Sequence, residues 1–203
     1  MHVAITGGTT GIGAKVVSKL KNQGHQVTVF DFIEITQSVD EFVHLDLSNN
    51  TSIEEALKNT NGPFDALINN AGIPPRENTE QKILMVNYIG MKTFLDGMLD
   101  KLNRGAAIVN TSSRAGSMWQ ENLKQVKRFM QLGVSELSNF VYKENIDPVR
   151  AYNLSKEAVN VLTMSRTEEF LAKGLRINSV CPAAVSTDIL QDFTNAFGEK
   201  VVK

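Results

Sequence analysis

Two kinds of segment alternate along this chain, and that alternation constrains its fold more than any other feature. Six short apolar runs predict β-strands: 3–6, 26–31, 42–46, 66–69, 106–112 and 176–181. Four longer segments with apolar residues at helical spacing lie among them: 12–23, 51–59, 79–102 and 151–173. Because the strands are apolar on both faces and alternate with helices, they predict a parallel sheet covered on both sides. We therefore expect an α/β fold of three layers, a doubly wound sheet in a single domain spanning 1–203.

The composition excludes several classes of protein. The chain is 42% hydrophobic and 21% charged with a net charge of −1, which fits an ordinary soluble domain. No Lys or Arg run predicts a nucleic-acid surface, no apolar stretch could cross a membrane, and no secretory signal is visible. The single Cys181 excludes an internal disulfide, fits a reducing compartment and is expected to pack in the core. The three His residues do not cluster, so we expect a cytoplasmic protein without a metal site.

Residues 117–147 break the alternation and predict a helical insertion. One face of a first helix would carry four apolar residues: Trp119, Leu123, Val126 and Met130. Leu137 and Val141 would begin a second helix, with Gly133 between the two. Long insertions beside active-site strands often act as lids or interfaces. The alternative is a surface helix pair that takes no part in the chemistry.

The first strand runs directly into a glycine-rich segment, Thr6–Gly13, at the start of a helix. Glycines let the backbone pass close to a ligand, and the helix N-terminus offers free N–H groups to phosphate. The glycine spacing differs from the G-x-G-x-x-G loop of standard Rossmann folds. Its place at a strand-to-helix junction still predicts a dinucleotide site, with these candidate residues: Gly7, Thr9, Thr10, Gly11, Ile12 and Gly13.

Asp31 ends the second predicted strand, about 20 residues after the glycine loop. A carboxylate at this place can accept hydrogen bonds from both hydroxyls of the adenosine ribose, and it would repel a 2′-phosphate. No Arg or Lys lies in the loop or directly beside Asp31 to offset that repulsion. The residue therefore favours NAD as the cofactor, the alternative being a strand-end acid without a ligand.

Polar residues also follow the fourth strand and interrupt the third helical segment. Asn69–Gly72 lies where the crevice of a doubly wound sheet is expected, which makes Asn70, Ala71 and Gly72 candidates for cofactor binding. Asn87 stands in an otherwise apolar helical stretch. Since Asn is a poor residue for a helix interior, Asn87 indicates a specific role, unless it simply faces solvent.

Three further residues predict proton-transfer chemistry. Ser113 follows the fifth strand, and Tyr152 and Lys156 lie four residues apart on one face of a helix. A tyrosine has an ordinary pKa of about 10, which a nearby ammonium and a cationic nicotinamide would lower toward neutrality. A serine hydroxyl can donate a hydrogen bond to a substrate oxygen. Together with the glycine loop, these residues predict an active site.

In this order the motifs are similar to those of the non-extended branch of the short-chain dehydrogenase/reductase family, across essentially the whole chain. The resemblance implies that Ser113 is the catalytic serine and Tyr152 the general acid/base. It implies that Lys156 also holds the nicotinamide ribose and that Asn87 holds a water of a proton relay. Five further cofactor contacts follow from it: Asp46 and Leu47 at the adenine, and Pro182, Val185 and Thr187 at the carboxamide.

Three departures from the family pattern stand out. Ala183 replaces the usual glycine after the proline. The gap from Ser113 to Tyr152 is long, as in the similar bacterial 3α-hydroxysteroid dehydrogenase/carbonyl reductase subgroup, which carries a helical insertion here. The chain also stops at Lys203, before the last strand of the family fold, so we expect that C-terminal strand to be missing.

The resemblance implies an NAD-dependent oxidoreductase that moves a hydride between NAD(H) and a small-molecule carbonyl or secondary alcohol. The alternative is a catalytically idle NAD-binding sensor that uses the same crevice for regulation. In family members without an insertion, the helices flanking this gap often pack against another subunit. Because residues 117–147 would obstruct that packing, we expect a homodimer.

Overall fold

Six parallel strands form one sheet in the order β3-β2-β1-β4-β5-β6. The structure is a computed structural model that describes residues 1–34, 38–187 and 189–198. The strands are β1 (His2–Thr6), β2 (Gln26–Asp31), β3 (Glu41–His44), β4 (Phe64–Asn69), β5 (Leu102–Thr111) and β6 (Arg176–Val180). The order reverses between β1 and β4, which opens a crevice at the carboxyl ends of the strands. The predicted doubly wound Rossmann sheet is confirmed.

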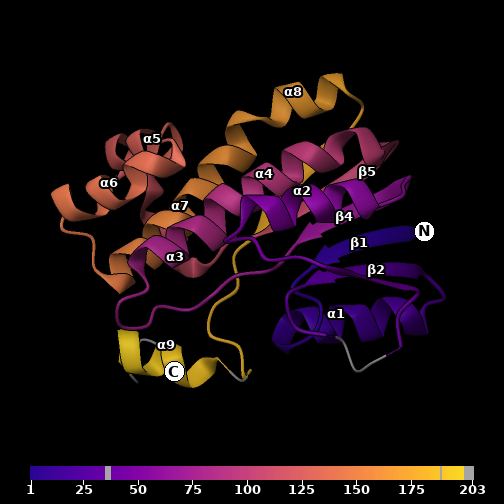
Figure 1. Ribbon diagram of the computed structural model, residues 1–203, viewed down its shortest axis with the longest axis horizontal. Coiled ribbons are helices and arrows are strands. Elements are labelled where there is room, and N and C mark those ends of the chain that lie inside the picture. Colours follow the sequence, from indigo (N-terminus) through magenta and orange to yellow (C-terminus); the bar gives the residue numbers. More distant parts are fainter. Residues whose placement is uncertain (35–37, 188, 199–203) are drawn as a thin grey trace.

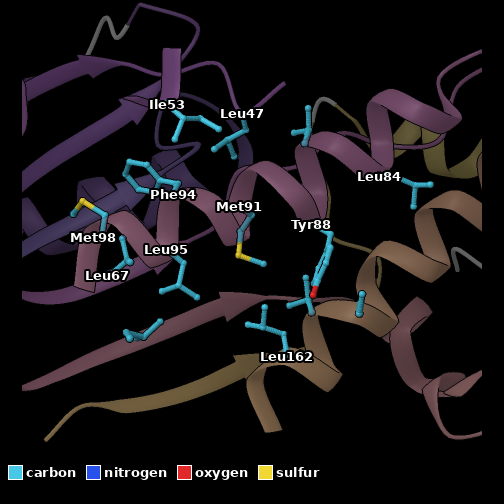
Figure 2. Packing of buried hydrophobic residues seen from close by; sticks show 14 of the residues in the cluster. Leu47, Ile53, Leu67, Leu84, Tyr88, Met91, Phe94, Leu95, Met98 and Leu162 are labelled. Atoms are coloured by element: carbon cyan, nitrogen blue, oxygen red, sulfur yellow. The ribbon is translucent and has the colours of Figure 1, made fainter. Parts of the chain in front are cut away.

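Helices cover both faces of this sheet, as Figure 1 shows. α1 (Gly11–Asn22) lies on one side, where Val17 packs with Val27 and Val29 of β2 in a small core. The larger core on the opposite side involves α2 (Asn50–Asn59), α4 (Met91–Met98), α7 (Pro148–Ser165) and α8 (Thr167–Ala172). Figure 2 shows Phe94 and Leu95 of α4 pointing from their helix toward the strands. The fold therefore has the three expected layers.

The third predicted helix, 79–102, is not a continuous α-helix. It consists of α3 (Glu80–Leu84), a π-helical turn at Met85–Gly90, α4 and a short 3-10 turn at Leu99–Lys101. Gly90 packs against the Leu47 carbonyl so closely that a Cβ would collide with that oxygen. Local spacing does not distinguish a π-helical turn from an α-helix, and such turns often occur at functional sites.

The insertion is helical, as its apolar spacing predicted. A 3-10 segment, Arg114–Trp119, leads into α5 (Leu123–Met130), and a short 3-10 turn, Val134–Glu136, leads into α6 (Leu137–Lys143). Phe129 of α5 is buried between two rings, with centroids 5.1 Å from Tyr88 and 6.1 Å from Phe140. The two helices therefore extend the hydrophobic core outward beside α3 and α7.

A buried carboxylate joins the insertion to α7. Glu157 is 0% exposed, and both its oxygens accept hydrogen bonds from the Arg150 guanidinium, at 3.0 and 2.7 Å. Asn122, directly before α5, donates to the same carboxylate at 2.7 Å. Arg150 also donates to Gln125 of α5 at 2.9 Å. Because a buried charge is tolerated only when its hydrogen bonds are satisfied, this cluster fixes where the insertion lies.

Among the residues that the structure describes, no helix is both long and apolar enough to cross a bilayer. No group of three or more His, Cys, Asp and Glu side chains among these residues is placed to hold a metal ion.

We predict that Glu157→Ala lowers the free energy of unfolding by about 3 kcal/mol, because it leaves the Arg150 guanidinium and the Asn122 amide without their partner. Urea denaturation measures this loss. The matched control is Glu144→Ala, which removes an ion pair with the exposed Arg128 and should cost about 1 kcal/mol or less. Equal losses in the two variants would contradict the anchoring role of Glu157.

Candidate active site

The carboxyl ends of the strands open into a cavity of about 620 Å³. Most of the predicted site residues line it: Gly7, Thr10, Gly11, Ile12, Asp31, Asp46, Leu47, Asn70, Ala71, Gly72, Ser113, Tyr152, Lys156, Pro182, Val185 and Thr187. Three predicted residues do not line it: Thr9, Gly13 and Asn87. Predicted residues up to 180 positions apart in the sequence, Gly7 and Thr187, thus meet at one site. The three exceptions lie outside the lining of the cavity.

The glycine loop passes close to the segment that follows β4. Gly7 has φ +67°, and a Cβ on it would come within 2.6 Å of the Ala71 Cα. A Cβ on Gly13 would collide with the carbonyl oxygen of Gly7, so Gly13 serves the packing of α1 against the loop. Thr10, the N-cap of α1, makes no side-chain cap hydrogen bond. The first N–H groups of α1 are therefore available to an anion beside the loop.

Asp31 is held in place by the loop that it faces. Its Oδ2 accepts hydrogen bonds from the Thr9 backbone N–H at 3.1 Å and from the Thr9 hydroxyl at 2.7 Å. Its Oδ1 accepts from the Ile33 N–H at 3.3 Å. The carboxylate is 7% exposed and lines the cavity at the end of β2. Thr9 therefore orients Asp31 and does not itself face the cavity.

Asp46 and Leu47 line the cavity next to β3. Burial raises the pKa of Asp46, but hydrogen bonds from Ser48 outweigh it and hold that pKa below its usual value. The Ser48 backbone N–H and hydroxyl donate to Oδ1 at 2.8 and 2.7 Å. Asp46 is therefore an ionised carboxylate at neutral pH, with its side chain fixed by its own turn.

Tyr152 and Lys156 project from the start of α7 beside Ser113. Asp147 caps this helix by accepting from the Arg150 N–H at 2.7 Å, which fixes where its first turns begin. The Lys156 Nζ donates to the Thr111 carbonyl at 2.9 Å and lies 5.7 Å from the centre of the Tyr152 ring. Ser112, in contrast, donates to the Lys156 carbonyl at 2.9 Å. β5 and α7 are thus joined at the site by hydrogen bonds in both directions.

Burial shifts the pKa values of Tyr152 and Lys156 in opposite directions. Burial raises the pKa of Tyr152, and a hydrogen bond with Ser113 offsets part of that rise. Burial lowers the pKa of Lys156 to about 8. We expected Lys156 to lower the pKa of Tyr152, yet burial dominates among the chain's own groups. At neutral pH Tyr152 is a protonated phenol, which suits a proton donor.

Asn87 lies on the π-helical turn and is 2% exposed, so it does not face solvent. Its Oδ1 accepts from the Ile73 N–H at 2.8 Å, and its Nδ2 donates to the Ile73 carbonyl at 3.0 Å. Its Nδ2 also lies 3.4 Å from the Ser155 hydroxyl. Ile73 itself lines the cavity. Asn87 thus fixes the backbone of the cavity wall after β4.

Sequence reasoning missed α9 (Leu190–Phe197), which supplies Phe193 and Phe197 to the cavity. These rings pack edge-on against Tyr152, with centroid distances of 5.1 and 6.2 Å. Their spacing of four residues was a helical signal within the sequence. The sequence makes the insertion a candidate lid over the site. Among residues 117–147, only Ser117 and Met118 line the cavity.

Two expectations near the C-terminal end had different outcomes. The segment 182–187 reaches the cavity through Pro182, Val185 and Thr187, as expected, and Ala183 lines it too. The prediction that Cys181 packs in the core is wrong, because Cys181 is exposed. It follows β6, the edge strand of the sheet, in which only Ile177 is buried.

Comparison with known proteins identifies the family. The model described as short chain dehydrogenase matches residues 1–125 and 141–196. The chain belongs to the short-chain dehydrogenase family and is an oxidoreductase of that family. The unmatched residues between these two ranges, 126–140, run from within α5 into α6 and so fall inside the insertion.

Individual relatives agree with this assignment. Coniferyl-alcohol dehydrogenase from Pseudomonas sp. strain HR199 is 30% identical over 200 residues, which cover 98% of this chain and 78% of that protein. The 3α-hydroxysteroid dehydrogenase/carbonyl reductase of Comamonas testosteroni is 26% identical, over 99% of this chain and 80% of the relative. The crystal structure of a 3α-hydroxysteroid dehydrogenase from Pseudomonas sp. B-0831, complexed with NADH, has a TM-score of 0.84 at 27% identity, covering 99% of this chain and 80% of the other.

The burial of Lys156 gives a testable prediction about stability. Its pKa is about 8 in the folded protein and about 10.5 when unfolded, so the unfolded chain binds more protons between these values. The native protein should therefore gain stability as the pH rises through this window. Relative to Lys156→Met, that gain should be about 3 kcal/mol between about pH 7 and pH 10.5, measured by urea denaturation. If the difference in unfolding free energy between the two proteins stayed constant with pH, burial would not lower the pKa of Lys156.

Proposed function

We propose that this protein is an NAD-dependent oxidoreductase that interconverts a carbonyl compound and a secondary alcohol. The observation that carries the proposal is the meeting of Ser113, Tyr152 and Lys156 at one end of a cavity. The ordered carboxylate of Asp31 lies in the same cavity, beside the glycine loop. A proton donor and a dinucleotide site in one cavity are what hydride transfer to a carbonyl requires.

The residues present fit NAD. The turn at Gly7, which has a positive φ, and the uncapped start of α1 would hold the phosphates. Thr10, Gly11 and Ile12 would complete this part of the site. Asp31 would accept hydrogen bonds from the adenosine ribose, while Asp46 and Leu47 would flank the adenine. The remaining contacts would come from Asn70, Ala71, Gly72, Pro182, Val185 and Thr187. The bound NADH of the structurally similar 3α-hydroxysteroid dehydrogenase supports this choice.

Bound NADH would supply the hydride in the reducing direction. The Ser113 hydroxyl would donate a hydrogen bond to the substrate carbonyl oxygen and stabilise the charge that develops there. The Tyr152 Oη, protonated because burial raises its pKa, would give its proton to that oxygen. Lys156 would hold the nicotinamide ribose, and Asn87 would hold the water that returns a proton to the site. The aromatic wall of α9 would help to exclude bulk water from Tyr152.

We further propose that the protein is a cytoplasmic homodimer without nucleic-acid or membrane partners. α5 and α6 pack beside α3 and α7, where they would stand in the way of a second subunit approaching those helices. Sedimentation equilibrium of the intact chain should give the mass of a dimer. A tetramer would show that the insertion does not block the approach.

A panel of carbonyl compounds, followed by NADH absorbance, tests the proposed activity. Turnover of any member supports an enzyme. NADH binding without turnover of any member would favour the alternative, an idle NAD-binding sensor. Substrate identity and the physiological direction would follow from the relative kcat/KM values of the compounds that react.

We predict that Tyr152→Phe lowers turnover by at least about a hundredfold, the scale expected when a general acid is lost. NADH affinity should change little, because the ring and its packing against Phe193 are kept. Steady-state kinetics and fluorescence titration with NADH measure the two quantities. Near-normal turnover in this variant would exclude Tyr152 as the proton donor.

We predict that the native protein binds NADH far more tightly than NADPH, because the Asp31 carboxylate would repel a 2′-phosphate. Asp31→Ala should reduce the difference between the affinities for NADH and NADPH, mainly by weakening NADH binding. Thr9→Ala is a useful companion, because it removes the hydroxyl that orients Asp31 and leaves the charge in place. Equal affinities of the native protein for the two cofactors would contradict the assignment of NAD.

A further inference from the structure

α9 provides an aromatic surface directly against the candidate proton donor. The Tyr152 ring meets Phe193 at 5.1 Å with an interplanar angle of 68°, and Phe197 at 6.2 Å with an angle of 73°. The two phenylalanine rings stack on each other at 6.3 Å. All three rings line the cavity. The position of α9 therefore determines the shape of the cavity beside Tyr152.

Few contacts hold α9 in that position. The helix has eight residues, Leu190–Phe197, and none of them is buried. Its side-chain hydrogen bonds from Gln191 and Thr194 stay within the helix. The ring contacts that α9 makes with the rest of the protein are those of Phe193 and Phe197 with Tyr152. A helix attached so lightly needs a further restraint to keep one position.

The restraint that the structure offers is a bidentate ion pair. The Arg76 guanidinium donates from Nε to Asp192 Oδ1 at 3.0 Å and from Nη2 to Oδ2 at 2.8 Å. Among the described residues, it is the only ion pair between α9 and another part of the chain. Asp192 also lies in the first turn of α9, where a carboxylate is favoured by the helix dipole.

The loop that presents Arg76 is itself ordered by local hydrogen bonds. Thr79 accepts from the Arg76 N–H at 3.2 Å and donates to the Arg76 carbonyl at 2.6 Å. This loop continues from Ile73, which Asn87 fixes and which lines the cavity. The hydrogen bond from Arg76 keeps the pKa of Asp192 below its usual value, so both groups are charged at neutral pH. The ion pair thus joins α9 to the loop that continues from the cavity wall at Ile73.

We propose that Arg76 and Asp192 are positioning residues that hold the Phe193–Phe197 face of α9 against Tyr152 and so form the substrate side of the cavity. The proposal rests on the proposed function, because it assigns the substrate to the space between α9 and Ser113. It implies that loss of the ion pair weakens binding of an apolar carbonyl compound but leaves cofactor binding intact. Because both side chains are partly exposed, salt should weaken the restraint.

A closely matched control exists in the same chain. Arg128 and Glu144 form another bidentate ion pair, with contacts of 2.9 and 3.0 Å, on the insertion. Both arginines are 59% exposed, and their partners Asp192 and Glu144 are 23% and 22% exposed. Arg128→Gln therefore removes an equivalent surface ion pair away from the cavity, while Arg76→Gln removes the one on α9.

The first measurement is millisecond amide hydrogen exchange across residues 190–197. In Arg76→Gln these amides should exchange about five times faster than in the native protein, and in Arg128→Gln they should not change. The charge swap, Arg76→Asp with Asp192→Arg, should recover part of the protection, limited by an arginine in the first turn of α9. About 0.5 M NaCl should accelerate exchange in the native protein but not in Arg76→Gln. Unchanged exchange in Arg76→Gln, or equal acceleration in the control, would overturn the proposal.

The second measurement links α9 to substrate binding without relying on turnover. In a Tyr152→Phe background saturated with NADH, acetophenone serves as the probe, and its Kd is measured by calorimetry. Adding Arg76→Gln should raise that Kd about fivefold, whereas adding Arg128→Gln should leave it unchanged, and the Kd for NADH should be the same in all three proteins. Faster exchange of α9 with an unchanged acetophenone Kd would overturn the positioning role. Absence of carbonyl turnover in the native protein would refute the proposed function but would leave the exchange result intact.

Discussion

The site depends on one buried hydroxyl at the end of the first strand. Thr6 Oγ1 accepts hydrogen bonds from the backbone N–H groups of Asn70 and Ala71, each at 3.1 Å. These bonds lie where the strand order reverses between β1 and β4. Asn70 returns a hydrogen bond from Nδ2 to the Gly7 carbonyl at 2.9 Å. These contacts fix the glycine loop against the segment after β4, and the crevice between the two strands keeps one shape.

A second buried chain of hydrogen bonds sets the position of α7, the helix that carries Tyr152 and Lys156. Asn69 of β4 donates to Asn110 of β5 at 2.8 Å, and Asn110 donates to Thr163 of α7 at 3.0 Å. All three residues are buried, so these bonds are strong and costly to leave unmade. They fix α7 relative to the neighbouring strands β4 and β5. The same burial that orders the helix also raises the pKa of Tyr152 and lowers that of Lys156.

The sequence predicted what local pattern determines and missed what depends on distant contacts. The bounds of β2, Gln26–Asp31, agree with the prediction because a strand that is buried on both faces after its first residue is rich in apolar residues. The π-helical turn around Asn87 was not predictable, since it involves the close approach of Gly90 to Leu47, a contact between residues far apart in the sequence. The spacing of the α9 phenylalanines could have indicated a helix, but their place beside Tyr152 depends on a contact between residues far apart in the sequence. Cys181 was misplaced because an apolar pattern does not reveal that β6 is an edge strand.

We propose that this cavity transfers a hydride from NADH to a carbonyl carbon beside Tyr152. The most direct test is to supply NADH deuterated at the transferring position of the nicotinamide, together with a reactive carbonyl compound, and to analyse the alcohol by mass spectrometry and NMR. We expect an alcohol that carries the deuterium on its carbinol carbon, with one stereochemistry imposed by the positions of the cofactor and Tyr152. An alcohol without deuterium, or NADH binding with no alcohol formed from any carbonyl, would contradict the proposal.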